Sequence, residues 1–231
     1  MDDRRGVRYY TTDVRYARLS ELLRMSPPGP LGKLSAFVVK VLRLPGPVLM
    51  RMAFYDTRRC AFSEIPELFQ RFAEEIRVLG EMGFSPAVAL RMPMIGGGSC
   101  CSLALLGEDP TMYANFVFSR TEVEGREYGE SGLSFVSRDT SVVWATSGMS
   151  HLLDGPDCVR AMYCPPGPVE KLLETHSSRL AGVPRASLLH FDCEDLTAHL
   201  LELEAMITDF NIARRVFRPL TSSEVARLSG D

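Results

Sequence analysis

The sequence has no pair of cysteines at C-x-x-C spacing and no pair of histidines at zinc-finger spacing. Its cysteines are Cys60, Cys100, Cys101, Cys158, Cys164 and Cys193, and its histidines are His151, His176, His190 and His199. These absences exclude the common structural zinc motifs. We therefore expect no metal and no cofactor.

The chain also lacks a membrane-spanning run and a secretion signal. No apolar run reaches the ~18 residues needed to cross a bilayer, because Lys40, Arg43 and two prolines interrupt the best candidate. Two aspartates follow Met1, unlike the basic and then apolar start of a signal peptide. We therefore expect a cytoplasmic protein whose thiols are reduced.

Lysine is scarce and positive charge is unevenly placed. Only three of the 26 basic residues are Lys, and residues 1–60 hold twelve Arg or Lys against five Asp or Glu, a balance of +7. Since the formal net charge is −3, the remaining residues sum to −10. A basic start on an acidic body favours either an external anionic partner or contact with the body itself. No nucleic-acid-binding motif accompanies it, so we expect no nucleic acid partner.

The basic region contains a predicted amphipathic helix over residues 31–43, between two Pro-Gly breaks. Its apolar residues fall within an arc of about 140°, and Lys33, Lys40 and Arg43 lie on the other side. Such a helix either packs on the body or lies on an anionic membrane surface. We expect these three cations to contact the anion or partner, within a basic helical extension that spans residues 1–44.

Residues 45–231 are predicted to form a single α+β domain. Apolar residues alternate with a period of two over 48–55, 88–92, 101–105, 112–118, 133–137 and 142–146, and a strand at 159–163 is optional. Helical spacing occurs at 63–79, 169–181, 192–217 and after Thr221. The middle segments indicate an antiparallel meander of about five strands, and the helices are expected to pack on one face of it.

The most unusual short segment is a run of three glycines directly before Ser99, Cys100 and Cys101. It lacks the order of a P-loop or a nucleophile elbow, and a hairpin connection explains it more simply. One of the two thiols could act as a nucleophile if His176 served as its base. However, His176 continues the Leu172 and Leu180 stripe, which is typical of a hydrogen-bonded core histidine. The acidic pair Glu202 and Glu204 is interpreted as a solvated helix face.

Together these observations favour a binding or assembly module over an enzyme. The sheet and its helices are predicted to form a groove for a protein or small ligand, while the basic helix makes an accessory contact to an acidic partner or membrane surface. A protein partner or self-assembly is the expected interaction. The alternative is a thiol-dependent enzyme that uses Cys100 or Cys101 with His176.

Overall fold

A computed structural model describes residues 8–26, 29–44, 52–96, 98–123, 126–148, 153–165 and 167–229, with no account of the side chains of 122–128. Its centre is a seven-stranded sheet in the order β2-β3-β4-β5-β6-β7-β8. The strands are β2 (Arg58–Arg59), β3 (Ser85–Met92), β4 (Ser99–Leu106), β5 (Met112–Val123), β6 (Arg126–Arg138), β7 (Val143–Ser147) and β8 (Val159–Tyr163). Neighbours are antiparallel except β7 and β8, which are parallel. The α+β class is therefore confirmed, whereas the estimate of about five strands was too low.

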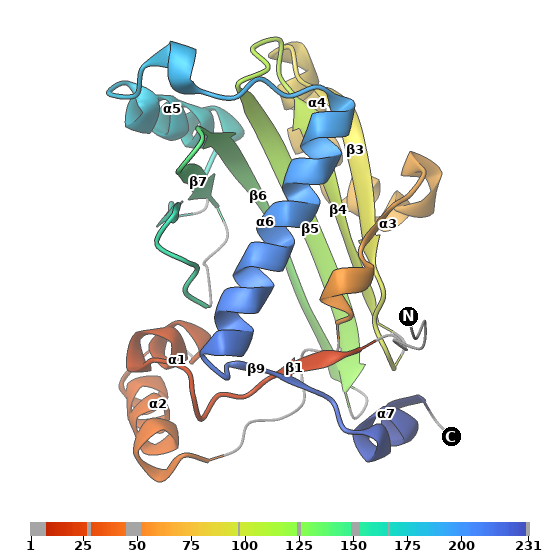
Figure 1. Ribbon diagram of the computed structural model, residues 1–231, viewed down its shortest axis with the longest axis vertical. Helices are drawn as coiled ribbons and strands as arrows, with labels where there is room; N and C mark the ends of the chain where they lie inside the picture. The colour runs from red at the N-terminus through yellow and green to blue at the C-terminus, as the bar shows by residue number, and fades with distance from the viewer. Residues whose placement is uncertain are drawn as a thin grey trace, which may run out of the picture.

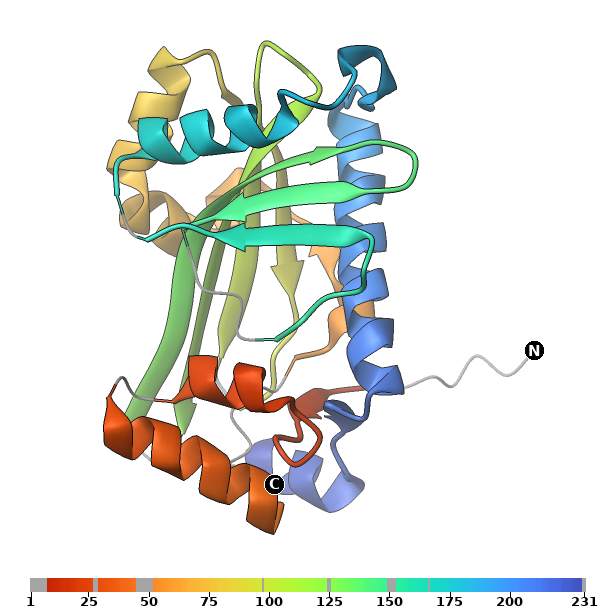
Figure 2. The ribbon, with the colours of Figure 1, turned by 90° about the vertical axis from the view of Figure 1, so that its left-hand side faces the viewer.

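Helices cover both faces of this sheet, as Figures 1 and 2 show, so the prediction of helices on one face was wrong. One face packs against α3 (Pro66–Arg71), α4 (Ala73–Glu81) and α5 (Val169–Leu180), and we call it the α5 face. The other packs against α6 (Cys193–Ala213), which crosses it diagonally, and we call it the α6 face. The run Leu103-Ala104-Leu105 in β4 is fully buried, as a strand covered on both sides requires.

The two sides of the core divide along the alternation of each strand. On the α5 face the core centres on Leu103, Phe116 and Phe135, and Phe72 packs on Phe116 with ring centroids 4.8 Å apart. On the α6 face Tyr113 and Val136 meet Leu196 and Leu200 of α6. Side chains that are neighbours along a strand point to opposite faces, so each long strand contributes to both cores.

Several predicted elements differ in detail. The helix expected over 63–79 is divided into a 3-10 turn η2 (Phe62–Glu64), α3 and α4, because Phe72 leaves helical geometry at φ −116° and ψ 26°. Of the strand expected over 48–55, residues 48–51 lie outside the described residues. Its remainder forms an isolated bridge at Met52 and the 3-10 turn η1 (Phe54–Asp56).

The two ends of the chain meet in a small second sheet. Strand β1 (Tyr10–Thr12) pairs antiparallel with β9 (Phe217–Pro219). The remaining elements are the helices α1 (Leu19–Met25), α2 (Pro30–Leu42) and α7 (Ser222–Ser229) and the 3-10 turn η3 (Arg185–Ser187). The helix that begins after Asp192 is capped as predicted, since the Asp192 carboxylate accepts from the amides of Glu194 and Asp195. It ends at Ala213, so Phe217 belongs to a strand. The division at residue 44 stays a prediction.

Candidate functional site

A helical hairpin near the N-terminus carries the most unusual surface. It consists of α1 (Leu19–Met25) and α2 (Pro30–Leu42), at the lower left of Figure 1. Pro30 begins α2 at a position where its missing N–H costs nothing. Arg43 ends the helix in the left-handed conformation at φ 49°, and its N–H donates to the carbonyl of Val39.

Small residues of α2 form its buried side. Gly32 and Ala36 are buried, and Ala36 belongs to a cluster with Ala17 and Leu22 of the preceding segment. Since these side chains are short, the two helices approach closely. Of the larger apolar residues of α2, only the partly buried Val39 packs against this cluster among the described residues.

Those large residues face outward instead. Leu31 is 81% exposed and Phe37 is 53% exposed. The exposed large apolar side chains on this helix are Leu31, Leu34, Phe37, Val38, Val41 and Leu42, and we call them the α2 apolar face. Two residues of α1, Leu19 and Leu23, are exposed as well. Single exposed apolar residues are ordinary, but a continuous helical row of them marks an interaction surface.

The three cations predicted to contact a partner belong to α2 or to its C-cap. Lys33 and Arg43 are exposed, whereas Lys40 is half-buried and donates from Nζ to the carbonyl of Ala17 at 2.7 Å. Residues 22–55 contain no Asp or Glu. The α2 apolar face is therefore flanked by positive charge alone along this part of the chain, and the contact of these cations with an anion stays a prediction.

Ion pairs and hydrogen bonds fasten the hairpin to the body. Arg18 and Arg24 both bind the carboxylate of Asp154, at 2.9 and 2.5 Å. Glu21 is fully buried and accepts from Arg214 at 2.5 Å and from the Asp154 amide at 2.8 Å. Burial alone would raise the pKa of Glu21, but the hydrogen bonds from Arg214 and the two backbone amides of Asp154 and Arg18 hold it below its usual value. No local pattern could predict the contact between Glu21 and Asp154, because the two residues are more than 130 positions apart.

The cysteines of the alternative hypothesis lie in the core. Cys100 and Cys101 are 7% and 2% exposed on opposite faces of β4. Burial raises the pKa of each thiol to about 12, so neither is a thiolate near neutral pH. The two side chains point to opposite faces of the sheet, as predicted. Both are buried, however, whereas the hypothesis needs one exposed thiol.

His176 is a buried histidine in a closed hydrogen-bond chain. Arg179 donates to the Thr146 hydroxyl at 2.7 Å, and the Thr146 and His176 side chains are joined at 2.9 Å through Nδ1. On the other side, Nε2 lies 3.1 Å from the Ser137 hydroxyl. Because Arg179 can only donate, its hydrogen bond favours a Thr146 hydroxyl that donates to Nδ1, which leaves Nε2–H to donate to Ser137. Burial and the Arg179 charge lower the pKa of His176 to about 4.

The structure does not bring His176 and the cysteines together. Cys101 pairs with Phe118, and Phe118 with Ser131 on β6. Ser137, the partner of His176, lies six positions further along β6, a separation of about 20 Å at the usual rise of a strand. The thiol-dependent alternative therefore finds no support in this geometry. His151 lies outside the described residues.

A second polar network lies on the α6 face, and sequence reasoning missed it. Arg138 forms an ion pair with Glu202 at 2.5 Å and contacts Nδ1 of His199 at 2.9 Å, while Nε2 of His199 lies 3.1 Å from the Tyr113 hydroxyl. Burial, together with the Arg138 charge, lowers the pKa of His199 to about 4. These groups form a hydrogen-bonded network beneath α6, and their tight pairing indicates a structural role.

Glu204 differs from its neighbour Glu202. Its carboxylate accepts from the Thr57 hydroxyl at 2.7 Å, and burial raises its pKa to about 7. The interpretation of both residues as a solvated helix face was therefore wrong for Glu204. Helical spacing could have indicated that Glu204 is buried, because it places this residue close to the line of Leu200 and Leu203.

Hollows in the described surface lie away from the centre of the sheet. A cavity of about 480 Å³ opens between Arg8, Tyr9 and residues of α7 such as Val225. A smaller one of about 280 Å³ lies at the distal ends of β5 and β6, beside Ser119 and Glu130. Leu196 and Leu200 fill the space under α6. The predicted groove between sheet and helices stays a prediction.

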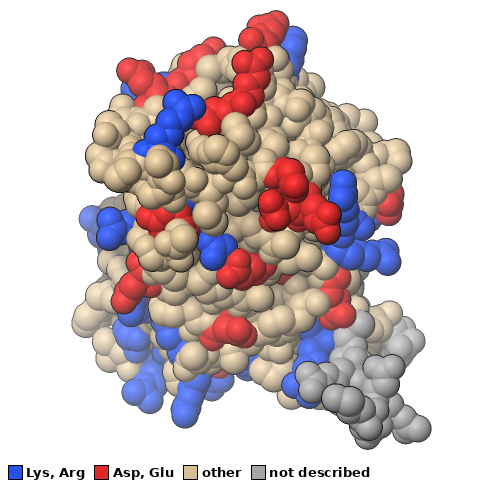
Figure 3. Space-filling view, turned by 45° about the horizontal axis from the view of Figure 1, so that its top comes forward, with Lys and Arg blue, Asp and Glu red and all other residues tan. Residues whose placement is uncertain are grey.

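Charged side chains of both signs are mixed over the face shown in Figure 3, where Lys and Arg gather towards the lower edge. Among the described residues, no group of three or more His, Cys, Asp or Glu is placed to hold a metal ion. None of the described helices has the length and apolar character to cross a bilayer. Comparison with known proteins adds no relative, because no protein family, curated protein or solved structure matches the chain.

Proposed function

We propose that the protein is a binding module that attaches to an anionic lipid surface through the α1–α2 hairpin. The observation that carries this proposal is the inverted packing of α2, which buries Gly32 and Ala36 and exposes the α2 apolar face. A helix that covered a core would bury its large residues. Exposing them costs stability relative to a packed arrangement, so an external apolar environment is the natural place for them.

Charge favours a lipid surface over a neutral apolar partner. Lys33 in α2 and Arg43 at its C-cap are exposed, and no acidic residue occurs between positions 22 and 55. Basic residues beside an anionic membrane contribute about 1 kcal/mol each. Apolar insertion and charge attraction would therefore act together at one surface.

The attachment of the hairpin supports a defined orientation. Arg18, Arg24 and Glu21 of the hairpin region bind Asp154 and Arg214 of the body, and Glu21 is fully buried. A hairpin that is held in this way presents the α2 apolar face on a fixed side of the molecule (Figure 2). Lipid attachment would then also orient the sheet.

The test is co-sedimentation of the full chain with phosphatidylcholine vesicles, with and without phosphatidylserine. We expect binding to the anionic vesicles that falls as salt is added. Phe37→Ser should weaken binding about fivefold, since a half-exposed Phe gains about 1 kcal/mol on insertion. Lys33→Glu should weaken it at least about tenfold.

Phe62→Ser is the matched control, because Phe62 is 40% exposed but lies in η2, outside the hairpin. It should bind like the unaltered protein. Equal binding to both kinds of vesicle, or equal binding by the Phe37 and Phe62 variants, would contradict the proposal. A concentration-dependent dimer that Phe37→Ser abolishes would instead identify the α2 apolar face as a contact between copies of the chain.

A further inference from the structure

The free edge of β8 is the second unusual surface of the molecule. Strand β8 ends the sheet, and Arg160 to Tyr163 are all exposed, including Met162 at 41% and Tyr163 at 49%. The opposite edge is only two residues long and consists of Arg58 and Arg59, the kind of short charged strand that blocks pairing. Strand β8 contains no proline and no lysine within its five residues.

The hydrogen-bond register shows which backbone groups face outward. The carbonyl of Cys158 accepts from the Val143 amide, and the amide of Cys164 donates to the Ser147 carbonyl. In a parallel ladder these two bonds place the even-numbered residues of β8 towards β7. The amide and carbonyl groups of Ala161 and Tyr163 therefore point away from the sheet, while the Val159 amide is bonded to Pro156.

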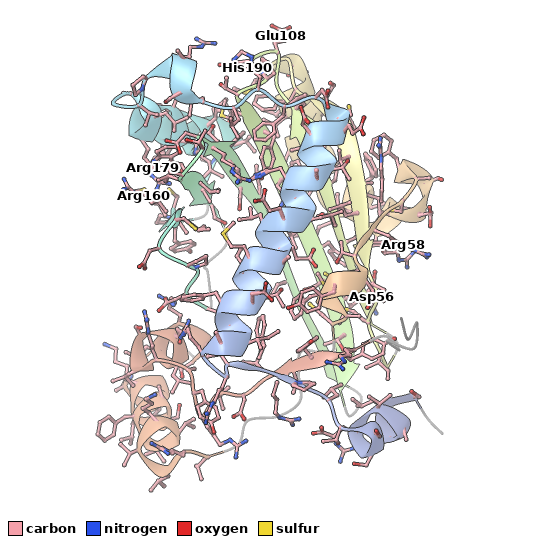
Figure 4. All side chains as sticks on the ribbon, viewed as in Figure 1. Asp56, Arg58, Glu108, Arg160, Arg179 and His190 are labelled. Carbon is pink, nitrogen blue, oxygen red and sulfur yellow. The ribbon has the colours of Figure 1, made fainter. Side chains whose placement is uncertain are left out.

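Two arginines make this edge positive. Arg179 of α5 bridges the last two strands by donating to the carbonyls of Ala145 and Arg160, at 2.6 and 2.7 Å. Its third acceptor is the neutral Thr146 hydroxyl. Arg160 is exposed on β8, and Figure 4 shows the two arginines next to each other at this side of the molecule. Asp139 lies within the charge field of Arg160, but its carboxylate already accepts from Ser141 and Val142.

We infer that the β8 edge accepts an extended acidic segment of a protein partner, which adds an eighth strand to the sheet. The partner backbone would bond to the outward groups of Ala161 and Tyr163. Its acidic side chains would lie beside Arg160 and Arg179, and its apolar ones on the opposite face beside Tyr163. A second copy of β8 is the poorer occupant, because pairing two such edges would bring Arg160 and Arg179 of both copies into one region.

Labelled peptides test this inference on the full chain. The probes are a short synthetic peptide that alternates Glu and Val and its Lys and Val counterpart, followed by fluorescence anisotropy. The Glu peptide should bind, and the Lys peptide should bind about tenfold more weakly. Arg160→Glu should remove most of this preference, because it reverses the charge beside the edge.

Ala161→Pro tests the backbone contact. The proline would remove an outward N–H and place its ring at the free edge, while the bonds of β8 to β7 stay intact. Glu-peptide binding should fall about tenfold, and Ala161→Val, which keeps the N–H, should retain it. A Glu peptide N-methylated on alternate residues provides the same test on the unaltered protein, should the proline variant fail to fold.

Three results would overturn the inference. The first is binding of neither peptide, and the second is equal binding of both. The third is a concentration-dependent dimer of the unaltered chain that Ala161→Pro abolishes, because the edge would then serve self-association. Light scattering over a range of protein concentrations distinguishes this last result from peptide binding.

Discussion

Acid should destabilise this protein through His176 and His199, the two histidines that are buried among the described residues, and His176 offers the sharpest test. Its folded-state pKa is about 4, against 6.5 for an ordinary histidine, because burial and Arg179 disfavour the charged ring. Between these values the unfolded chain binds more protons than the folded one. Stability is therefore complete above pH 6.5 and falls as the pH drops towards 4. The difference between 6.5 and about 4 corresponds to a loss of about 3 kcal/mol in the free energy of unfolding.

The substitution His176→Gln removes this titration. At pH 7 the variant should be less stable by about 1–2 kcal/mol, since one amide cannot serve both Thr146 and Ser137. Near pH 4.5 the deficit should shrink or reverse, because only in the unaltered protein does folding keep a histidine neutral at a pH where the unfolded chain would protonate it. Urea unfolding at a series of pH values measures the difference, and Trp144, 8% exposed on β7, reports it by fluorescence.

Comparing the two proteins cancels the contribution to the pH dependence from carboxylates that also titrate in acid, such as Glu21 and Glu224. The reasoning is refuted if the free energies of unfolding of the two proteins run parallel from pH 7.5 to 4.5. A titration of the His176 ring by NMR near its ordinary pKa would refute it as well. His199→Gln serves as an independent repeat, because His199 has the same pKa of about 4 on the opposite face of the sheet.

Two further predictions concern Glu204 and Gly129. Burial raises the pKa of Glu204 from 4.5 to about 7, so its contribution to stability is lost as the pH rises through 7. At pH 8 Glu204→Gln should therefore have a free energy of unfolding up to about 3 kcal/mol higher than the unaltered protein, and its urea midpoint should be higher. An unchanged midpoint would contradict this prediction. A Cβ at Gly129 would lie 2.7 Å from the backbone oxygen of Ser119, so Gly129→Ala should cost about 1–3 kcal/mol, whereas Gly182→Ala, with open space around it, should cost little in the same thermal melt.

The local sequence pattern predicted where the strands lie but not what packs around them. The alternation at 101–105 and 112–118 located β4 and β5, since a period of two follows directly from the strand backbone. The only feature of the sequence that indicates helices on both faces of the sheet is the unbroken apolar run from Leu103 to Leu106. Strand β8 pairs parallel to β7 through a long connection, and no local signal specifies such a register.

The site shows the same division between local and distant information. Helical spacing predicted that residues 31–43 form an amphipathic helix, and α2 spans nearly the same range. Which side of that helix is buried depends on Ala17 and Leu22, which no spacing rule connects to it. The role of Glu21 depends on Arg214, at the far end of the chain. Charge pairs between distant segments leave no periodic trace in a sequence.

The two proposed surfaces lie on the same side of the molecule, where Figure 2 shows α2 and the strand β8 facing the viewer. They use different physics, because α2 offers apolar side chains and β8 offers backbone groups that no described residue pairs with. Phe37 and Arg160 belong to neither of the cores around Phe116 and Tyr113. Substitutions at Phe37 or Arg160 should therefore leave the unfolding free energy nearly unchanged while altering binding. A residue that served only the fold would show the opposite behaviour, and this contrast separates interaction surfaces from structural ones.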